Sequence, residues 1–228
     1  MPPKRAALNT QAQRLQSMEA TKFNAKRLNF HREMAKAYHG FLTYTFIQNA
    51  GNTDLHRGLA EFRNKFLSCY YIESEHTPVP EWFQGEILTR YKGSNRRYLR
   101  GDYYSEAALR VIGGPRLASN ELRFEHILPK GEAIKDACEA GFKKGDPIAV
   151  EAIAQLLDER GHIAVITKVE HDMLRTHRKM PKDFPSNLFA RYRDDNGGML
   201  FPLLRSIEEG VHCKTLLSSA VTIALELG

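Results

Sequence analysis

The chain has 228 residues, 42% of them hydrophobic and 26% charged, which is typical of a globular protein with one substantial core or two small ones. Its three cysteines stand far apart without paired spacing, which argues against a disulfide framework and a structural zinc knuckle and favours a reducing, cytoplasmic setting. A net charge of +6 and a pI near 9.2 favour polyanionic partners. The basic N-terminus lacks a secretory apolar run, and no stretch approaches the roughly 18 apolar residues of a membrane span, so no membrane partner is expected.

Residues 1–80 are predicted to form a helical N-terminal region. A basic tip at 1–10 precedes good helix formers from Gln11 to His39, and Gly40 is expected to end that helix. The aromatic and β-branched run FLTYTFI at 41–47 is compatible with a strand, although its position between helical patterns leaves the assignment open.

A loop, NAGNTD, is expected next. Asp54 would be the N-cap of a helix from Leu55 to about Tyr71, whose apolar residues recur at helical spacing. Pro78 and Pro80 then mark a linker, because proline fits neither a regular helix nor a central strand.

Residues 81–121 are predicted to be a basic, tyrosine-rich connecting segment. Its cations are candidates for contact with nucleic-acid phosphates, namely Arg90, Lys92, Arg96, Arg97 and Arg100. The tyrosines between them could stack on bases: Tyr91, Tyr98, Tyr103 and Tyr104. The alternative is a solvated hairpin that turns at GSN and packs these tyrosines on the core.

Residues 122–200 contain the candidate site. Leu122 to Leu128 is a predicted strand that ends at Pro129 and sets Glu125 beside His126. The elements predicted after it are helices at 132–141 and 147–160, a buried strand at 163–167, and a helix that begins near Lys168, carries His171 and ends before Pro181. Gly161 is expected to close the second helix.

Three short segments carry a resemblance to a known family: RFEHILPK (123–130), ITKVEHDMLRTHRKMP (166–181) and LFARYRDDNG (188–197). The order of a strand with Glu-His, a second strand and a helix with histidine resembles the HNH, or ββα-metal, endonucleases of the zinc-free type, also called His-Me finger nucleases. The resemblance covers about residues 122–197. It implies an α+β, mainly helical fold, with a ββα-metal core that carries a helical insert and follows a helical N-terminal region.

The resemblance also implies roles for individual residues. His126 would be the general base that accepts a proton from the attacking water, while Glu125 and His171 would hold one divalent metal ion, magnesium or manganese. A histidine ligand also suits cobalt or nickel. Further cations that could contact nucleic acid are Lys130, Arg175 and Arg191.

Two departures from the family leave the ligand set open. The asparagine that usually orients the base has no counterpart on the strand at 163–167, and the insert between the strands is long and helical. His162 or His177 could therefore replace a named ligand, and Arg191 could pair with Asp194 or Asp195 instead of a phosphate.

The last segment, 201–228, is expected to be helical and to pack on the core or form a homodimer contact. The sequence thus predicts a metal-dependent endonuclease that acts on DNA. A restriction, defence or phage-encoded enzyme is compatible with it, and RNA is an alternative substrate. The alternative is a non-catalytic nucleic-acid-binding protein in which Glu125, His126 and His171 are structural. Target sequence, strand preference and oligomeric state stay open.

Overall fold

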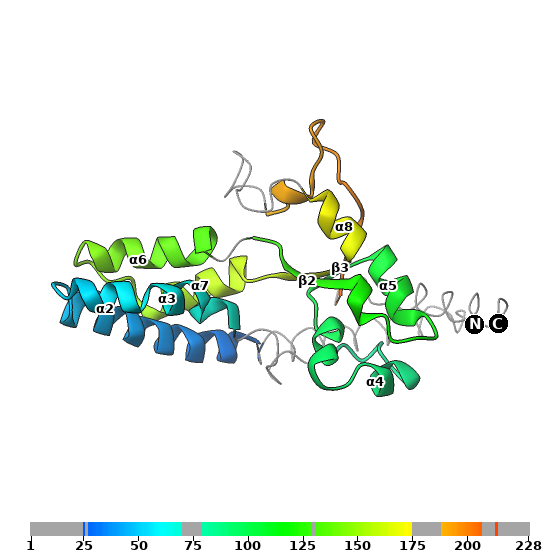
Figure 1. Cartoon of the computed structure of the whole chain (residues 1–228), viewed down its shortest axis with the longest axis horizontal. Helices are drawn as coiled ribbons and strands as arrows, with labels where there is room; N and C mark the ends of the chain where they lie inside the picture. Colours follow the sequence, from blue (N-terminus) through cyan, green and yellow to red (C-terminus); the bar gives the residue numbers. More distant parts are fainter. Residues whose placement is uncertain are drawn as a thin grey trace, which may run out of the picture.

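Two lobes lie along the long axis of the molecule in the computed structural model (Figure 1). The structure describes residues 25, 27–69, 79–128, 131–174, 188–206 and 213. The helical lobe comprises residues 27–69, 128 and 131–160, and the sheet lobe comprises residues 79–127, 163–174 and 188–206. The predicted α+β, mainly helical fold is confirmed. Among the described residues, no helix combines the length and apolar character needed to cross a bilayer.

The helical lobe begins with a helix over residues 27–42 that continues without a break into a π-helical turn, Thr43–Gln48. The prediction that Gly40 ends the helix is therefore wrong, and the run at 41–47, whose assignment the sequence left open, is helical. Ala35, Tyr38 and Leu42 explain the difference, because they recur at helical spacing and are fully buried in the core of this lobe.

The rest of the helical lobe packs around that first helix. Its elements are α2 (Thr53–Gly58), α3 (Ala60–Cys69), the π-helical turn Gly131–Lys135, α6 (Asp136–Lys143) and α7 (Val150–Arg160). The side chain of Asn52, not Asp54 as predicted, caps α2 by accepting the amide hydrogen of Leu55 at 2.9 Å. Gly161 ends α7 as predicted, but at φ −82°; a Cβ there would lie 2.3 Å from the carbonyl oxygen of Leu157, so close approach is the reason for glycine.

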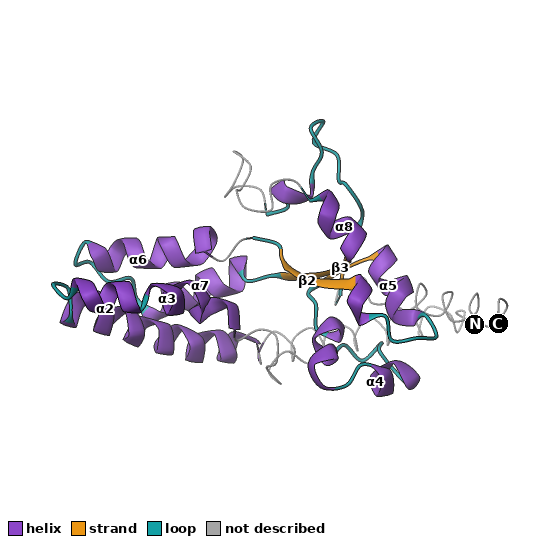
Figure 2. Cartoon of the chain, viewed as in Figure 1, coloured by secondary structure: helices purple, strands orange, loops and turns teal. Residues whose placement is uncertain are grey.

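The sheet, drawn in orange in Figure 2, lies between the covering helices. Its four short strands follow the order β2-β3-β1-β4. They are β1 (Tyr103–Ser105), β2 (Leu122–His126), β3 (Ile163–Thr167) and β4 (Leu203–Arg205). β3 pairs antiparallel with β2 and parallel with β1, while β4 pairs antiparallel with β1. The predicted strands β2 and β3 are confirmed, whereas β1 was not foreseen.

Each face of the sheet is covered. On one face Val165 and Phe124 pack with α4 (Glu86–Arg90) and α5 (Glu106–Gly113). On the other face Ala164 and Ile166 pack with Leu174, Tyr192 and Phe201. Helix α8 (Lys168–Met173) follows β3 directly and ends well before Pro181, because Leu174 adopts an extended conformation; the predicted longer helix is wrong.

The basic, tyrosine-rich segment is not the predicted connecting segment or hairpin. Most of it forms α4, the 3-10 helix Gly93–Leu99, β1 and α5, all of which belong to the sheet lobe. Its tyrosines are core residues, at most 8% exposed, so they are not available to stack on bases: Tyr91, Tyr98, Tyr103 and Tyr104.

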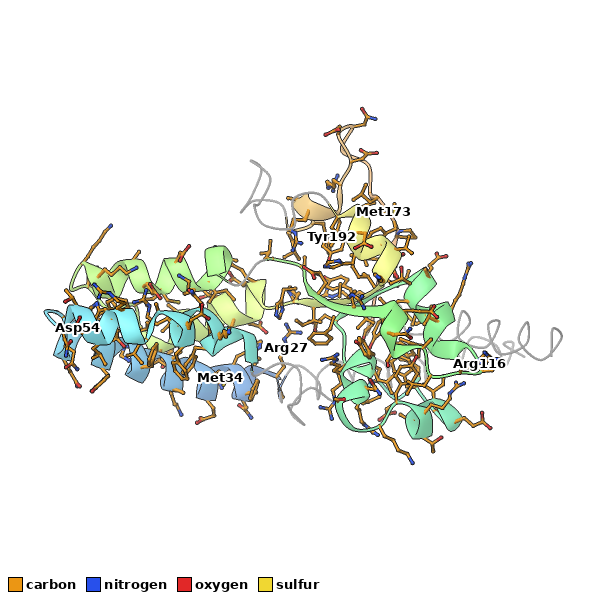
Figure 3. All side chains as sticks on the ribbon, in the orientation of Figure 1. Arg27, Met34, Asp54, Arg116, Met173 and Tyr192 are labelled. Carbon is orange, nitrogen blue, oxygen red and sulfur yellow. The ribbon has the colours of Figure 1, made fainter. Side chains whose placement is uncertain are left out.

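A group of charged side chains, here called the junction cluster, joins the two lobes near Arg27 (Figure 3). Its members are Arg27, His31, Asp102, Asp158 and His162. Arg27 of the helical lobe donates to Asp102, which precedes β1, and Asp102 also accepts the amide hydrogen of Ile163 at 2.8 Å. The expected C-terminal helical segment, 201–228, lies outside the described residues except for 201–206 and the buried Cys213. At Leu203–Arg205 the prediction of a helix is wrong, because these residues form β4 and pair antiparallel with β1.

Candidate functional site

The candidate site forms where α8 packs on β2 and β3. The predicted order of strand, strand and helix is confirmed, and the two strands pair so that Glu125 lies opposite Ala164. Directly paired residues of antiparallel strands share one face of a sheet. Glu125 therefore lies on the face that carries Ala164, Ile166, Leu174 and Tyr192.

Three side chains meet on this face, and we call them the site cluster: Glu125, His171 and Arg191. The Nε2 atom of His171 lies 3.4 Å from Oε2 of Glu125. Arg191 donates from Nη1 to Oε1 of Glu125 at 2.8 Å and lies 3.3 Å from the carbonyl oxygen of His126. The side chains of Glu125 and His171 are 18% and 29% exposed, whereas that of Arg191 is only 3% exposed.

The position of His171 depends on how α8 begins. Thr167 is the N-cap and forms a capping box with Glu170, whose Oε2 atom accepts from the Thr167 amide at 2.8 Å. Ser105, the N-cap of α5, donates to the same oxygen at 2.6 Å. Glu170 is thus tied to two elements, and it fixes the first turn of α8, from which the next residue, His171, reaches Glu125.

The other ring nitrogen of His171 faces a second carboxylate. Its Nδ1 atom lies 3.5 Å from Oδ1 of Asp172. Histidines that bind a metal through one nitrogen usually donate the other N–H to a carboxylate or carbonyl, which holds the ring in orientation. The geometry of His171 fits that pattern, with Nε2 directed at Glu125.

His126 is not brought to the site cluster. Successive residues of a strand project to opposite faces, so His126 lies on the face of Phe124 and Val165 and not on that of Glu125. Its ring centroid is 6.4 Å from that of Phe124, edge to face. The role of His126 as general base stays a prediction, and the strand geometry counts against it.

The site cluster suits a divalent ion that keeps part of its water shell. Within the described parts of the chain, no group of three or more His, Cys, Asp or Glu side chains is arranged to hold a metal. Glu125 and His171 would supply two ligands, one oxygen and one nitrogen. Magnesium is commonly held by one or two carboxylates together with water and substrate phosphate, and an imidazole also suits manganese.

Arg191 was predicted only for contact with nucleic acid or a nearby aspartate, and nothing local indicates its pairing with Glu125, 66 residues away. Ser105 was missed, although a serine directly before the helix-forming run EAALR is a typical N-cap. Thr167 and Glu170 were missed too, although they match the capping-box spacing.

Tyr192 lies next to Arg191 and is fully buried. Burial raises the pKa of its phenol well above the ordinary value, and the Glu125 carboxylate raises it further. The hydroxyl has no hydrogen-bond partner among the described residues. Tyr192 therefore stays protonated beside the site (Figure 3).

The remaining predicted residues lie elsewhere. Arg90 donates to the carbonyl oxygen of Gly114, and Arg97 contacts the ring and hydroxyl of Tyr98, so both are engaged within the sheet lobe. Lys92 is exposed, while Arg96 and Arg100 are half-buried. His162, an alternative ligand, belongs to the junction cluster. Three predicted residues lie outside the described parts of the chain: Lys130, Arg175 and His177.

Comparison of the chain with family models, with curated proteins and with solved structures gives no match.

Proposed function

We propose that the protein is a metal-dependent endonuclease that hydrolyses phosphodiester bonds of DNA. The observation that carries this proposal is the convergence of Glu125 and His171 at 3.4 Å, from a strand and from the helix packed on it, with Arg191 beside them. A carboxylate with an imidazole is a donor pair for a divalent ion, and a guanidinium is the side chain best shaped for phosphate.

Each residue of the site cluster has a role in this proposal. Glu125 and His171 hold the ion, and Arg191 binds a phosphate oxygen of the DNA backbone. When bound, a divalent ion offsets negative charge that develops on the phosphate and the leaving oxygen. Asp172 is a positioning residue that keeps His171 oriented.

The chain beyond the site cluster also supports a polyanionic substrate. The net charge is +6, and exposed cations such as Lys92 and Lys168 lie on the sheet lobe. These charges favour any nucleic acid, so they do not separate DNA from RNA.

The test is a cleavage assay on plasmid DNA, with RNA in parallel, in magnesium or manganese with and without a chelator. We expect metal-dependent cleavage that falls about 100-fold in Glu125→Gln and in His171→Ala, because each variant removes one metal ligand. Matched controls are Glu121→Gln, an exposed glutamate before the same strand, and His39→Ala in the helical lobe; both should cleave normally.

Two results would contradict the proposal. Cleavage that survives both site variants would place the chemistry elsewhere, and the absence of metal-dependent cleavage on DNA and RNA would favour a non-catalytic nucleic-acid-binding protein. Binding of labelled duplex by gel shift, measured on the same preparations, identifies that second case.

His126 is tested separately. His126→Ala should leave manganese binding unchanged, because its side chain lies on the other face of β2. A selective loss of cleavage with intact metal binding would identify His126 as the base, whereas full cleavage would remove it from the mechanism.

A further inference from the structure

The charged side chains of the site cluster pair with one another. Both carboxylate oxygens of Glu125 have partners: Oε1 accepts from Arg191 at 2.8 Å, and Oε2 lies 3.4 Å from Nε2 of His171. Arg191 is almost completely buried, so its charge is held against this carboxylate and against the carbonyl oxygen of His126, with little contact with solvent. The negative charge that would attract a metal ion is therefore already offset by a cation of the same chain.

This arrangement makes a metal ion and Arg191 competitors. A divalent cation held between Oε2 of Glu125 and Nε2 of His171 would share this one carboxylate with the guanidinium on Oε1. Two buried cations that share a single negative charge repel each other, and each is paired less completely than it would be alone. Metal binding in the absence of another anion is therefore opposed by Arg191.

A phosphodiester removes this opposition. Its anionic oxygens match the fork of a guanidinium, so Arg191 can exchange the carboxylate for a phosphate and stay paired. Glu125 is then released to the metal ion. Because coupling between two ligands is reciprocal, the phosphate must favour the metal as much as the metal favours the phosphate.

We propose that Arg191 couples the two ligands of this site, so that Glu125 binds a divalent cation well only when a phosphodiester holds Arg191. This inference rests on the proposed function, since it assumes that Glu125 and His171 are the metal pair, and it adds how the substrate regulates metal binding at that site.

Manganese affinity, measured by the electron paramagnetic resonance signal of free Mn²⁺, tests the coupling without any cleavage. The probe is dimethyl phosphate, the smallest stable phosphodiester anion, and the matched control is trimethyl phosphate, which carries no charge. We expect dimethyl phosphate to tighten Mn²⁺ binding by the full-length protein about tenfold, within the usual range of coupling between sites, and trimethyl phosphate to have no effect.

A second experiment measures Mn²⁺ binding after Arg191 is substituted. Arg191→Gln should bind Mn²⁺ about tenfold more tightly than the wild type without any phosphate, and it should no longer respond to dimethyl phosphate. Arg193→Gln is the control, because Arg193 donates to the carbonyl oxygen of Gly197 on the adjacent loop and should behave as the wild type. If Arg191→Gln does not fold, the response of wild-type Mn²⁺ binding to dimethyl phosphate still tests the coupling.

The outcomes separate the two proposals. Mn²⁺ binding that is lost in Glu125→Gln but does not respond to dimethyl phosphate would overturn the coupling and leave the metal site intact. Mn²⁺ binding that is the same in Glu125→Gln and in the wild type would overturn the metal site itself.

Discussion

Two clusters with the same chemistry lie in this molecule, and their surroundings differ. The site cluster joins one arginine to one carboxylate with a histidine close by, and the junction cluster joins one arginine to two carboxylates with two histidines close by. In the junction cluster the carboxylate of Asp102 is 6% exposed and also accepts a backbone amide hydrogen from β3. In the site cluster the carboxylate of Glu125 is 18% exposed, and its partners among the described residues are side chains.

This difference in exposure and in backbone partners distinguishes a structural ion pair, in the junction cluster, from an ion pair that can exchange partners, in the site cluster. Burial alone would raise the pKa of Asp102, but Arg27 first, then His162 and the Ile163 amide, lower it to about 2. Asp102 thus stays charged, and one of its partners is a backbone amide of β3. Glu125 has no such backbone partner in the described chain, and side-chain partners can turn away when a ligand arrives. We infer that the first cluster holds the lobes together and the second serves binding.

The largest effect on stability is expected at the junction. Asp102→Asn removes the charge that pairs with the buried Arg27, and breaking a buried ion pair in this way typically costs about 3–5 kcal/mol. Urea unfolding followed by circular dichroism measures this free energy. A loss below about 1 kcal/mol would contradict a structural role for the cluster.

The same residue gives a pH signature. The pKa of Asp102 is lower in the folded protein than its ordinary value of 3.8, so its contribution to stability is complete above 3.8 and is lost as the pH falls through about 2. The wild type should therefore lose stability over this acid range by more than Asp102→Asn does.

Glu125→Gln should show the opposite pattern to the junction variant. Cleavage is expected to fall about 100-fold, while the free energy of unfolding falls by less than in Asp102→Asn, since Glu125 is more exposed than Asp102 and has no backbone amide as a partner among the described residues. Unfolding and cleavage measured on one preparation check both values. A stability loss as large as that of Asp102→Asn would make Glu125 a structural residue too.

A smaller effect is expected where the sheet positions α8. Ser105→Ala removes the N-cap of α5 and the hydrogen bond to Glu170, and we expect a loss of about 2 kcal/mol. Cleavage should fall with it, because Glu170 fixes the turn that carries His171. Ser119→Ala, at the 3-10 turn before β2, is the control and should change neither quantity.

The smallest effect is the pH dependence set by His31. Burial lowers the pKa of His31 below 6.5, and the hydrogen bond with Asp158 only partly opposes this. The unfolded chain therefore binds the proton more readily, so this contribution to stability is present above pH 6.5 and is lost as the pH falls below it. His31→Asn should flatten the stability profile there; an unchanged slope would show that another group causes it.

The parts of the site that local patterns encode could be predicted. β3 is a β-branched run bounded by Gly161, and a helical pattern follows it from Lys168, so both elements were foreseen; the capping box of Thr167 and Glu170 marks the same start. The resemblance to the HNH nucleases implied that Glu125 and His171 would meet, and they lie 3.4 Å apart. The sequence left the assignment of 41–47 open, because burial of one helix face, which decides it, competes there with β propensity.

Long-range pairings could not be predicted from local patterns. β1 has only three residues, and it joins the sheet by pairing in parallel with β3, about 60 positions later in the chain. Arg27 and Asp102 are separated by 75 positions, and Arg191 and Glu125 by 66. Such pairings depend on tertiary packing. From local sequence alone, the partner of a basic side chain can be a phosphate of a ligand or a carboxylate of the same chain.

The central claim is that Glu125 and His171 hold one divalent ion. Pulsed electron paramagnetic resonance of the Mn²⁺-loaded protein with dimethyl phosphate tests it directly, because an imidazole ligand gives a nitrogen hyperfine coupling. We predict one such coupling, lost in His171→Ala and retained in His126→Ala. A coupling that survives in His171→Ala, or none in the wild type when Mn²⁺ is bound, would contradict this account.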